Sequence, residues 1–171
     1  PPEAEPLPAA SAPAPERRKR IYSGSCGLIV DDVERTKRQL GSFAEANGGY
    51  VESASGGTIV LRVPAERFRE LFDQVLGFGE VTRSSVETQD VSDTFRDLEA
   101  RLAISQSARE RLYRLLERAT EVEERLAILR EIKRLSEEIE RVRLRLDSLE
   151  RQVAFSRITV ELESRLAAEQ L

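Results

Sequence analysis

The sequence predicts an α+β protein in which a small sheet domain carries a long antiparallel helical hairpin of the coiled-coil type. Three observations predict this fold. Alternating strands flank two amphipathic helices within residues 21–90, two long segments within residues 91–152 have apolar residues at three-four spacing, and a last alternating strand follows within residues 153–163. Because strands precede and follow the hairpin, we expect it to be inserted into the sheet domain.

The composition restricts the functions that the chain can have. Of its 171 residues, 34% are charged and 5% are aromatic, which is typical of a long arm with two solvated faces. The net charge of −4, with basic residues dispersed among acidic ones, argues against nucleic-acid binding. The absence of histidine removes the commonest general base and metal ligand, and a single cysteine excludes an intrachain disulfide.

Residues 1–20 hold six of the seven prolines and predict an extended tether with polyproline II character. The tether ends in four basic residues, Arg17-Arg18-Lys19-Arg20. Attraction to an anionic membrane surface is one interpretation of this run, and a solvated flank before the first strand is the favoured one. A chain that lacks methionine and begins at Pro1 is expected to be a processed or truncated piece, with any targeting segment outside it. No apolar run approaches the roughly 18 residues that a membrane span needs.

The first strand and helix are predicted over residues 21–30 and 32–47. One face of the strand is apolar or small, with Tyr22, Gly24, Cys26, Leu28 and Val30. Asp31 or Asp32 can cap the helix, and its buried side is expected to hold Val33, Leu40, Phe43 and Ala44. Asn47-Gly48-Gly49 predicts the end of this helix and a turn.

The next segments predict strands over residues 50–54 and 58–63. Ser55-Gly56-Gly57 between them is either a hairpin turn or a loop in an interrupted strand. Pro64 fits the first turn of a second helix, which is expected to bury Phe68, Leu71, Phe72 and Val75 and to end at Leu76, before Gly77 and Gly79. A mostly polar strand over residues 80–89 follows.

Two apolar seams predict the hairpin. The first seam has six apolar residues in eight positions, namely Phe95, Leu98, Leu102, Ser105, Arg109, Leu112, Leu116 and Ala119. The second is apolar throughout, with Ile128, Ile132, Leu135, Ile139, Val142, Leu146 and Leu149. The second seam is displaced by two residues, roughly 200° around a helix, so a reversal near Thr120 is needed for the seams to face each other. Thr120 and Glu123 are predicted to form a capping box at the start of the second helix.

The final strand is predicted from Val153-Ala154-Phe155 through residues 158–162, and residues 164–171 are expected to be a fraying tail or the start of a further segment. The resulting order is β-α-β-α-β, the hairpin, and a last β, with both helices of the sheet domain on one face. The sequence does not determine the strand order.

Several segments together resemble the bacterial domain of unknown function 4349 over about residues 20–163. The resemblance rests on GGYVE at residues 48–52, LRVPAERF at 61–68, GFGEV at 77–81, DVSDTFRDLEARL at 90–102 and FSRITVEL at 155–162. Members of that family are typically envelope proteins with lipoprotein or transmembrane anchors. The resemblance therefore implies an extracytoplasmic, membrane-anchored domain whose anchor is not in this chain. It implies no activity and no functional residues.

The groups that could carry chemistry have simpler structural interpretations. Cys26 is interpreted as a small buried residue rather than a redox or lipid-attachment site. Gly56-Gly57-Thr58 and Gly77-Phe78-Gly79 lack full phosphate-loop spacing and are interpreted as turns. Asp90, Asp93 and Asp97 could suggest a cation site but more simply favour the start of a helix. Ser84, Ser85 and Ser156 have no histidine to activate them. We therefore predict no catalytic, cofactor-binding or metal-binding residues.

Three classes of function remain at this stage. The favoured one is a non-catalytic interaction or scaffold module whose hairpin binds another protein or a second copy, with no nucleic acid and no small-molecule substrate. The first alternative is an extracytoplasmic sensory or ligand-binding domain, which a deep apolar pocket would favour. The second is an enzyme that uses paired carboxylates.

Overall fold

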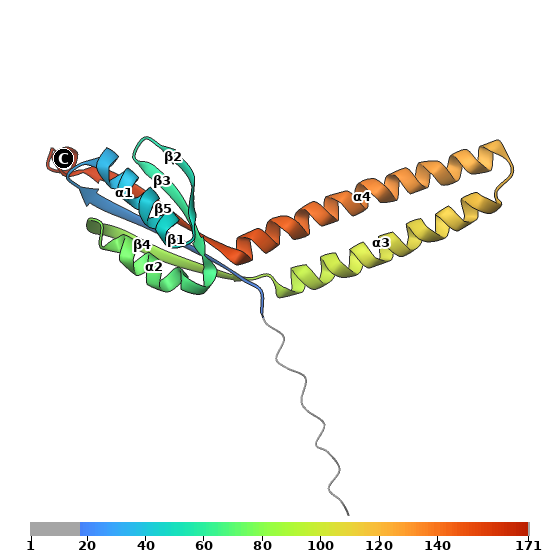
Figure 1. Ribbon diagram of the computed structural model, residues 1–171, viewed down its shortest axis with the longest axis horizontal. Coiled ribbons are helices and arrows are strands. Elements are labelled where there is room, and N and C mark those ends of the chain that lie inside the picture. The colour runs from blue at the N-terminus through green and yellow to red at the C-terminus, as the bar shows by residue number, and fades with distance from the viewer. Residues whose placement is uncertain (1–17, 171) are drawn as a thin grey trace, which may run out of the picture.

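The computed structural model describes residues 18–170 and shows an α+β protein built on one five-stranded mixed sheet. The strand order is β2-β3-β5-β1-β4. Two helices cover one face of the sheet, and two longer helices pack together and project from one end of it (Figure 1). The predicted tether over residues 1–17 lies outside the described residues.

Two neighbouring inner strands of the sheet come from opposite ends of the described chain. β1 (Arg20–Val30) and β5 (Phe155–Ser164) run parallel, with Cys26 paired to Val160 and Leu28 to Leu162. Their alternation places one set of residues on the helix-covered face, as predicted for β1. The set is fully or nearly fully buried in both strands: Cys26, Leu28, Val30, Ser156, Ile158, Val160 and Leu162.

The strands on the two sides of the sheet differ in their pairing and exposure. β2 (Tyr50–Ser55) and β3 (Thr58–Pro64) form a hairpin, so the hairpin alternative for residues 55–57 is correct. Gly57 is required in this turn because a Cβ there would lie 2.7 Å from the Leu162 carbonyl oxygen of β5. On the other side of the sheet, β4 (Glu80–Asp90) pairs only with β1 and is exposed along its whole length.

Helices α1 (Val33–Ala46) and α2 (Phe68–Leu76) form the second layer. The Asp32 carboxylate caps α1 by accepting a hydrogen bond from the Arg35 amide at 3.0 Å. The predicted end of α1 is confirmed, because Gly48 has a φ of +82° and the Gly49 amide donates to the Ala44 carbonyl. Pro64 is the last residue of β3, and a short 3₁₀ turn, η1 (Ala65–Arg67), precedes α2, so the helix begins later than predicted.

The sheet and its two helices share one apolar core. The inward residues of β1, β3 and β5 pack against the apolar faces of α1 and α2. Tyr22, Phe68 and Phe72 stack in series, with ring centroids 5.9 and 5.7 Å apart. The opposite face of the sheet is polar, and there Glu52 of β2 accepts hydrogen bonds from Arg62 and Arg157. The result is a two-layer region with one face open to solvent.

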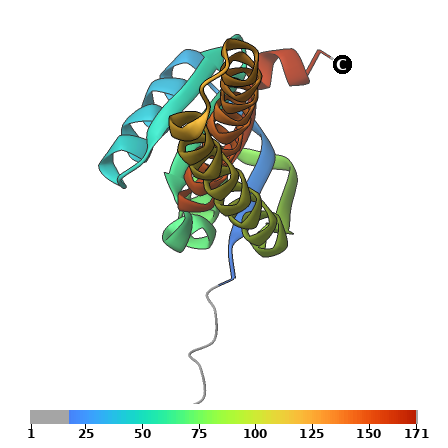
Figure 2. The ribbon, with the colours of Figure 1, turned by 90° about the vertical axis from the view of Figure 1, so that its right-hand side faces the viewer.

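The arm consists of α3 (Ser92–Arg118) and α4 (Val122–Ala154) and lies between β4 and β5 in the chain. At 1.5 Å per residue, α4 is roughly 50 Å long. The two helices lie side by side in both views and reverse at residues 119–121 (Figures 1 and 2). Six of the seven predicted seam residues of α4 are buried against α3: Ile132, Leu135, Ile139, Val142, Leu146 and Leu149.

Two predictions about the ends of the arm are wrong. Thr120 does not cap α4, because the helix begins at Val122, Glu121 occupies the N-cap and no side chain caps it. The last strand begins at Phe155 rather than Val153, because Val153 continues the spacing of the α4 seam and packs against the cluster between the helices. Helix α4 therefore passes into β5 without a loop.

The C-terminal segment is not an irregular tail over its described part. Residues Arg165–Ala168 form a short helix, α5. The Arg165 guanidinium contacts the carboxylates of Asp31 and Glu80, both at 3.2 Å, and so ties α5 to the ends of β1 and β4. Leu171 lies outside the described residues.

Candidate functional site

The root of the arm is fixed to the start of β1 by several polar contacts. The Asp90 carboxylate accepts hydrogen bonds from the Ser92 amide at 3.0 Å and from Arg18 at 3.1 Å. These contacts lower the pKa of Asp90 to about 2, with the Ser92 amide the largest cause. Ser92 in turn accepts a hydrogen bond from the Lys19 amide at 2.9 Å. Asp90 therefore stabilises the first turn of α3, as the sequence suggested for this acidic residue.

An apolar cluster completes the root. Lys19 places its ammonium 4.6 Å from the centroid of the Phe95 ring, and Phe95 is buried. Around Phe95 lie Val91, which directly precedes α3, and three residues of α4, namely Val142, Leu146 and Leu149. This cluster joins the start of α3 to α4, and Ile21 of β1 packs against it, so it connects the arm to the sheet.

The middle of the arm contains a polar interruption of its seam. Ser105 is buried and Arg109 is half-buried on α3, where a regular apolar seam would have leucine or isoleucine. The Arg109 guanidinium donates to the Ser136 hydroxyl of α4 at 3.2 Å. Beyond this point Leu112 and Leu116 are only half-buried. On α4 the seam is buried from Ile132 to Leu149, whereas Ile128, nearer the turn, is only half-buried.

The turn at the end of the arm is held by Arg125. Its guanidinium donates to the carbonyl oxygens of Leu116 at 2.9 Å and Ala119 at 3.0 Å, which are unpaired at the end of α3. This contact explains how the chain reverses without glycine or proline. This contact cannot be predicted from the sequence, because an arginine on a charged helix has no signal that distinguishes a capping role.

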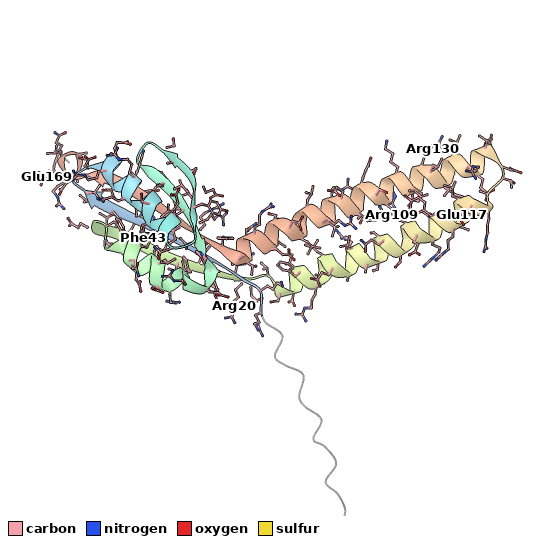
Figure 3. All side chains as sticks on the ribbon, viewed as in Figure 1. Arg20, Phe43, Arg109, Glu117, Arg130 and Glu169 are labelled. Carbon is pink, nitrogen blue, oxygen red and sulfur yellow. The ribbon has the colours of Figure 1, made fainter. Side chains whose placement is uncertain are left out.

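The distal end of α4 carries a second apolar stripe beside the seam. Val122, Leu126 and Leu129 are 71%, 45% and 46% exposed, and their spacing of four and three residues places them on one face. Tyr113 and Leu115 of α3 are also exposed near this end of the arm. Elsewhere on the distal half charged side chains project into solvent, among them Glu117 and Arg130 (Figure 3). The stripe is the largest set of exposed apolar side chains at regular spacing on α4.

The candidate cysteine has the environment of a structural residue. Cys26 is fully buried in the core. Burial raises the pKa of its thiol to about 11, although the positive charge of Arg83 opposes the shift. A thiol with a raised pKa holds little thiolate at neutral pH and is a poor nucleophile.

The other candidate groups do not converge on one place. The glycines of residues 56–57 and 77–79 lie at turns, and Gly79 approaches the Ile29 carbonyl so closely that a Cβ would lie 2.7 Å from it. Asp93 pairs with Arg96 on the surface of α3. Ser84 and Ser85 lie on the exposed edge strand, whereas Ser156 is buried and its hydroxyl makes no hydrogen bond. Within residues 18–170 no three His, Cys, Asp or Glu side chains gather where they could hold a metal ion.

An open hollow of about 700 Å³ lies between the root of the arm and α2. Tyr22 and Phe68 form its apolar part, and Val153 closes it on the side of the arm. Its basic side chains are Arg18, Lys19, Arg20 and Arg69, and Glu66 is its acidic one. The hollow is amphipathic and open rather than a deep apolar pocket.

Comparisons with known proteins identify the family but no relative with a described activity. No curated protein and no solved structure matches the chain. In the part of the chain that the structure describes, no helix is long and apolar enough to cross a membrane. Residues 18–170 match the family described as domain of unknown function (DUF4349), which covers the sheet and the arm together. The chain therefore belongs to the DUF4349 family.

Proposed function

We propose that this protein is a non-catalytic interaction or scaffold module whose arm contacts another protein or a second copy through its distal end. The exposed stripe of Val122, Leu126 and Leu129 carries the proposal. Apolar side chains at such spacing on an unpartnered helix face are typical of surfaces that receive another helix. The fixed root of the arm supports the proposal too, because it holds the stripe at a set position relative to the sheet.

The proposal includes coiled-coil packing between the arm and its partner. The seam between α3 and α4 already follows three-four spacing, and the stripe on α4 begins a second seam of the same spacing. A partner helix lying against the stripe would cover the half-exposed distal leucines. The charged residues around the stripe would remain in water at the rim.

We place this module outside the cytoplasm, close to a membrane, with its anchor outside this chain. The family resemblance supports the placement, because it implies an anchored, extracytoplasmic domain for this chain. The sequence before β1 is rich in proline, a composition typical of segments that hold a domain at a distance from its anchor. An arm roughly 50 Å long would extend the reach of the module further.

Light scattering of the purified chain tests whether the arm mediates self-assembly. Three proteins are compared: the natural chain, the double variant Leu126→Glu with Leu129→Glu, and Leu144→Glu. Leu144 is the matched control because it is 60% exposed on the same helix but lies nearer the root. An oligomer that becomes a monomer in the double variant alone supports self-assembly through the arm. An oligomer of unchanged mass in the double variant contradicts self-assembly through the arm. If the natural chain is a monomer, the partner of the arm is a different protein.

A sensory or ligand-binding role is the second candidate, and the hollow at the root of the arm is the observation that favours it. The hollow fits a small amphipathic anion. Its apolar part would contact Tyr22 and Phe68, and its charged group would contact Arg20 or Arg69. Because Val153 of α4 lines the same hollow, such a ligand would also contact the root of the arm. Calorimetric titration with octyl phosphate tests this role. Binding that is lost in Arg69→Glu supports it, and the absence of heat with the natural chain contradicts it.

A further inference from the structure

The edge strand β4 is the longest unpaired strand edge in the described chain. All eleven of its residues are exposed, and β1 pairs with one side of it alone. Val81 and Val86 are 44% and 41% exposed, so neither α1 nor α2 covers this strand. An edge of this kind offers a row of backbone donors and acceptors to another strand.

The backbone pattern shows which residues of β4 face outward. The Val91 amide donates to the Lys19 carbonyl at 2.8 Å, one position beyond the paired strands. Antiparallel pairs alternate between hydrogen-bonded and non-hydrogen-bonded residues, so the backbone groups of Ser84, Val86 and Thr88 point away from β1. A register shift opposite Gly27 places a bulge at Thr82 and confines the regular edge to residues 83–90.

We propose that β4 pairs antiparallel with β4 of a second copy of this chain about a two-fold axis at Ser85. Outward-facing residues must pair with outward-facing residues, so Ser84 of each copy lies opposite Val86 of the other. The same register places Arg83 opposite Glu87 at two symmetric positions. Both residues lie on the open face of the sheet, as the contact between Arg83 and Ser25 shows for Arg83.

Charge complementarity selects this register and this partner. A shift of two residues in either direction places Arg83 opposite Ser85 or Gln89 and leaves Glu87 without a cation. In the isolated chain Arg83 contacts Glu161 at 2.7 Å, whereas Glu87 has no ion-pair partner among residues 18–170. Glu161 lies on β5, two strands inward from β4, and Arg83 also contacts Ser25 of β1 at 3.0 Å, so Arg83 must turn outward and leave Glu161 to contact Glu87 of the second copy.

The pairing would join two sheets into one continuous sheet. Helix α3 begins at Ser92, directly after β4, so the antiparallel arrangement sends the two arms from opposite ends of the joined sheet. Both distal stripes stay free in this dimer. The edge contact is therefore separate from the arm contact proposed above, and either can exist without the other.

Proline at Val86 tests the backbone pairing in the full chain. Val86→Pro removes an outward amide that β1 does not use, so the intramolecular sheet is retained. Val86→Thr is the matched control because it keeps the amide. Sedimentation equilibrium should show a dimer for the natural chain and for Val86→Thr, and a dissociation constant raised more than about tenfold for Val86→Pro. In hydrogen exchange, the amides of Ser84 and Val86, which pair with each other across the axis, should exchange more slowly with rising protein concentration.

Charge substitutions test the register. Glu87→Arg opposes Arg83 with a like charge at both symmetric positions and should weaken the dimer by about tenfold. An equal mixture of Glu87→Arg and Arg83→Glu chains should restore dimerisation, because every crossed pair is again opposite in charge. A natural chain that is a monomer at all concentrations overturns the proposal. So does a dimer that Val86→Pro leaves intact and that the double substitution of Leu126 and Leu129 removes.

Discussion

The sheet region and the arm are both helix-containing structures of similar chain length, but they are held together in different ways. In the sheet region the residues of three strands and two helices meet in one core, in which Leu40, Leu61 and Leu71 are fully buried. In the arm two helices meet along a single seam. That seam is apolar at the root and polar at Ser105 and Arg109 of α3, and on α4 it is buried from Ile132 to Leu149 but only half-buried at Ile128, nearer the turn.

This difference separates the residues that stabilise the fold from the residues that are free to contact another protein. A residue in the sheet core has neighbours from several segments distant in the sequence, so its loss affects the whole region. A residue at the distal end of the arm has one partner helix, and the opposite side of each helix is open. Leucines placed on that open side, such as Leu126 and Leu129, contribute little to folding and are available to a partner.

The largest expected effect comes from a charge in the sheet core. Leu71→Asp places a carboxylate without a partner among fully buried side chains and should abolish cooperative folding of the sheet region. Circular dichroism with urea titration measures the loss. Leu166→Asp is the control, because Leu166 is 73% exposed on α5 and its substitution should change stability by less than about 0.5 kcal/mol. A normal unfolding transition in Leu71→Asp would show that this core is not the centre of stability.

A charge at the root of the arm should separate the two regions. Val142 is 5% exposed within the cluster around Phe95, so Val142→Asp should destabilise the arm by more than about 2 kcal/mol and open the hairpin. The sheet region should keep its NMR chemical shifts because it has its own core. Leu144→Asp, on the exposed side of the same helix, should leave the arm closed. Unchanged melting of Val142→Asp would refute the assignment of the seam, and loss of the sheet signals would refute the independence of the two regions.

A smaller effect is expected at the turn of the arm. Arg125→Ala removes the donors that satisfy the carbonyls of Leu116 and Ala119, and it should destabilise the end of α3 by about 1 kcal/mol. Hydrogen exchange of the amides in the last turns of α3 should accelerate, while those at the root stay protected. Arg130→Ala serves as the control. Equal exchange in the two variants would assign the turn to the helices themselves rather than to Arg125.

The smallest expected effect is a pH dependence at the root. The pKa of Asp90 is lowered to about 2 in the folded chain, below its ordinary value of about 3.9. Its contribution to stability is therefore complete above about pH 4 and lost as the pH falls towards 2. Carbon-detected NMR should follow this low titration midpoint, and Arg18→Ala should raise it. A midpoint near 4 in the natural chain would show that Asp90 does not hold the first turn of α3.

Periodicity was sufficient to predict most elements of the fold. The three-four spacing of Ile132 to Leu149 predicted a packed helix, and the alternation of Ile158, Val160 and Leu162 predicted a strand. Periodicity did not place a boundary correctly where the helical and the strand pattern fit the same residues. Val153 suits the seam and the strand equally, and the tertiary contact with the arm root determines that it belongs to α4.

The contacts that shape the site were harder to predict because they join distant residues. Strand order depends on which edges pair in space, and the parallel contact of β1 with β5 links residues more than a hundred positions apart. The hydrogen bonds of Arg125 to the end of α3 depend on the angle between two helices, which one sequence does not specify. The exposed stripe of Val122, Leu126 and Leu129 could not be recognised in the sequence, because the buried seam beside it has the same types of residue.

Site-specific photocrosslinking in the native cell tests the central claim, that the distal end of the arm is a contact surface. A photoreactive amino acid is placed at Leu126 in one strain and at Leu144 in another, within the complete natural protein. We expect a discrete crosslinked product from position 126 that is absent from position 144 and is lost when Leu129→Glu is added. Equal products from both positions, or none from position 126 in cells that produce the protein normally, would contradict it.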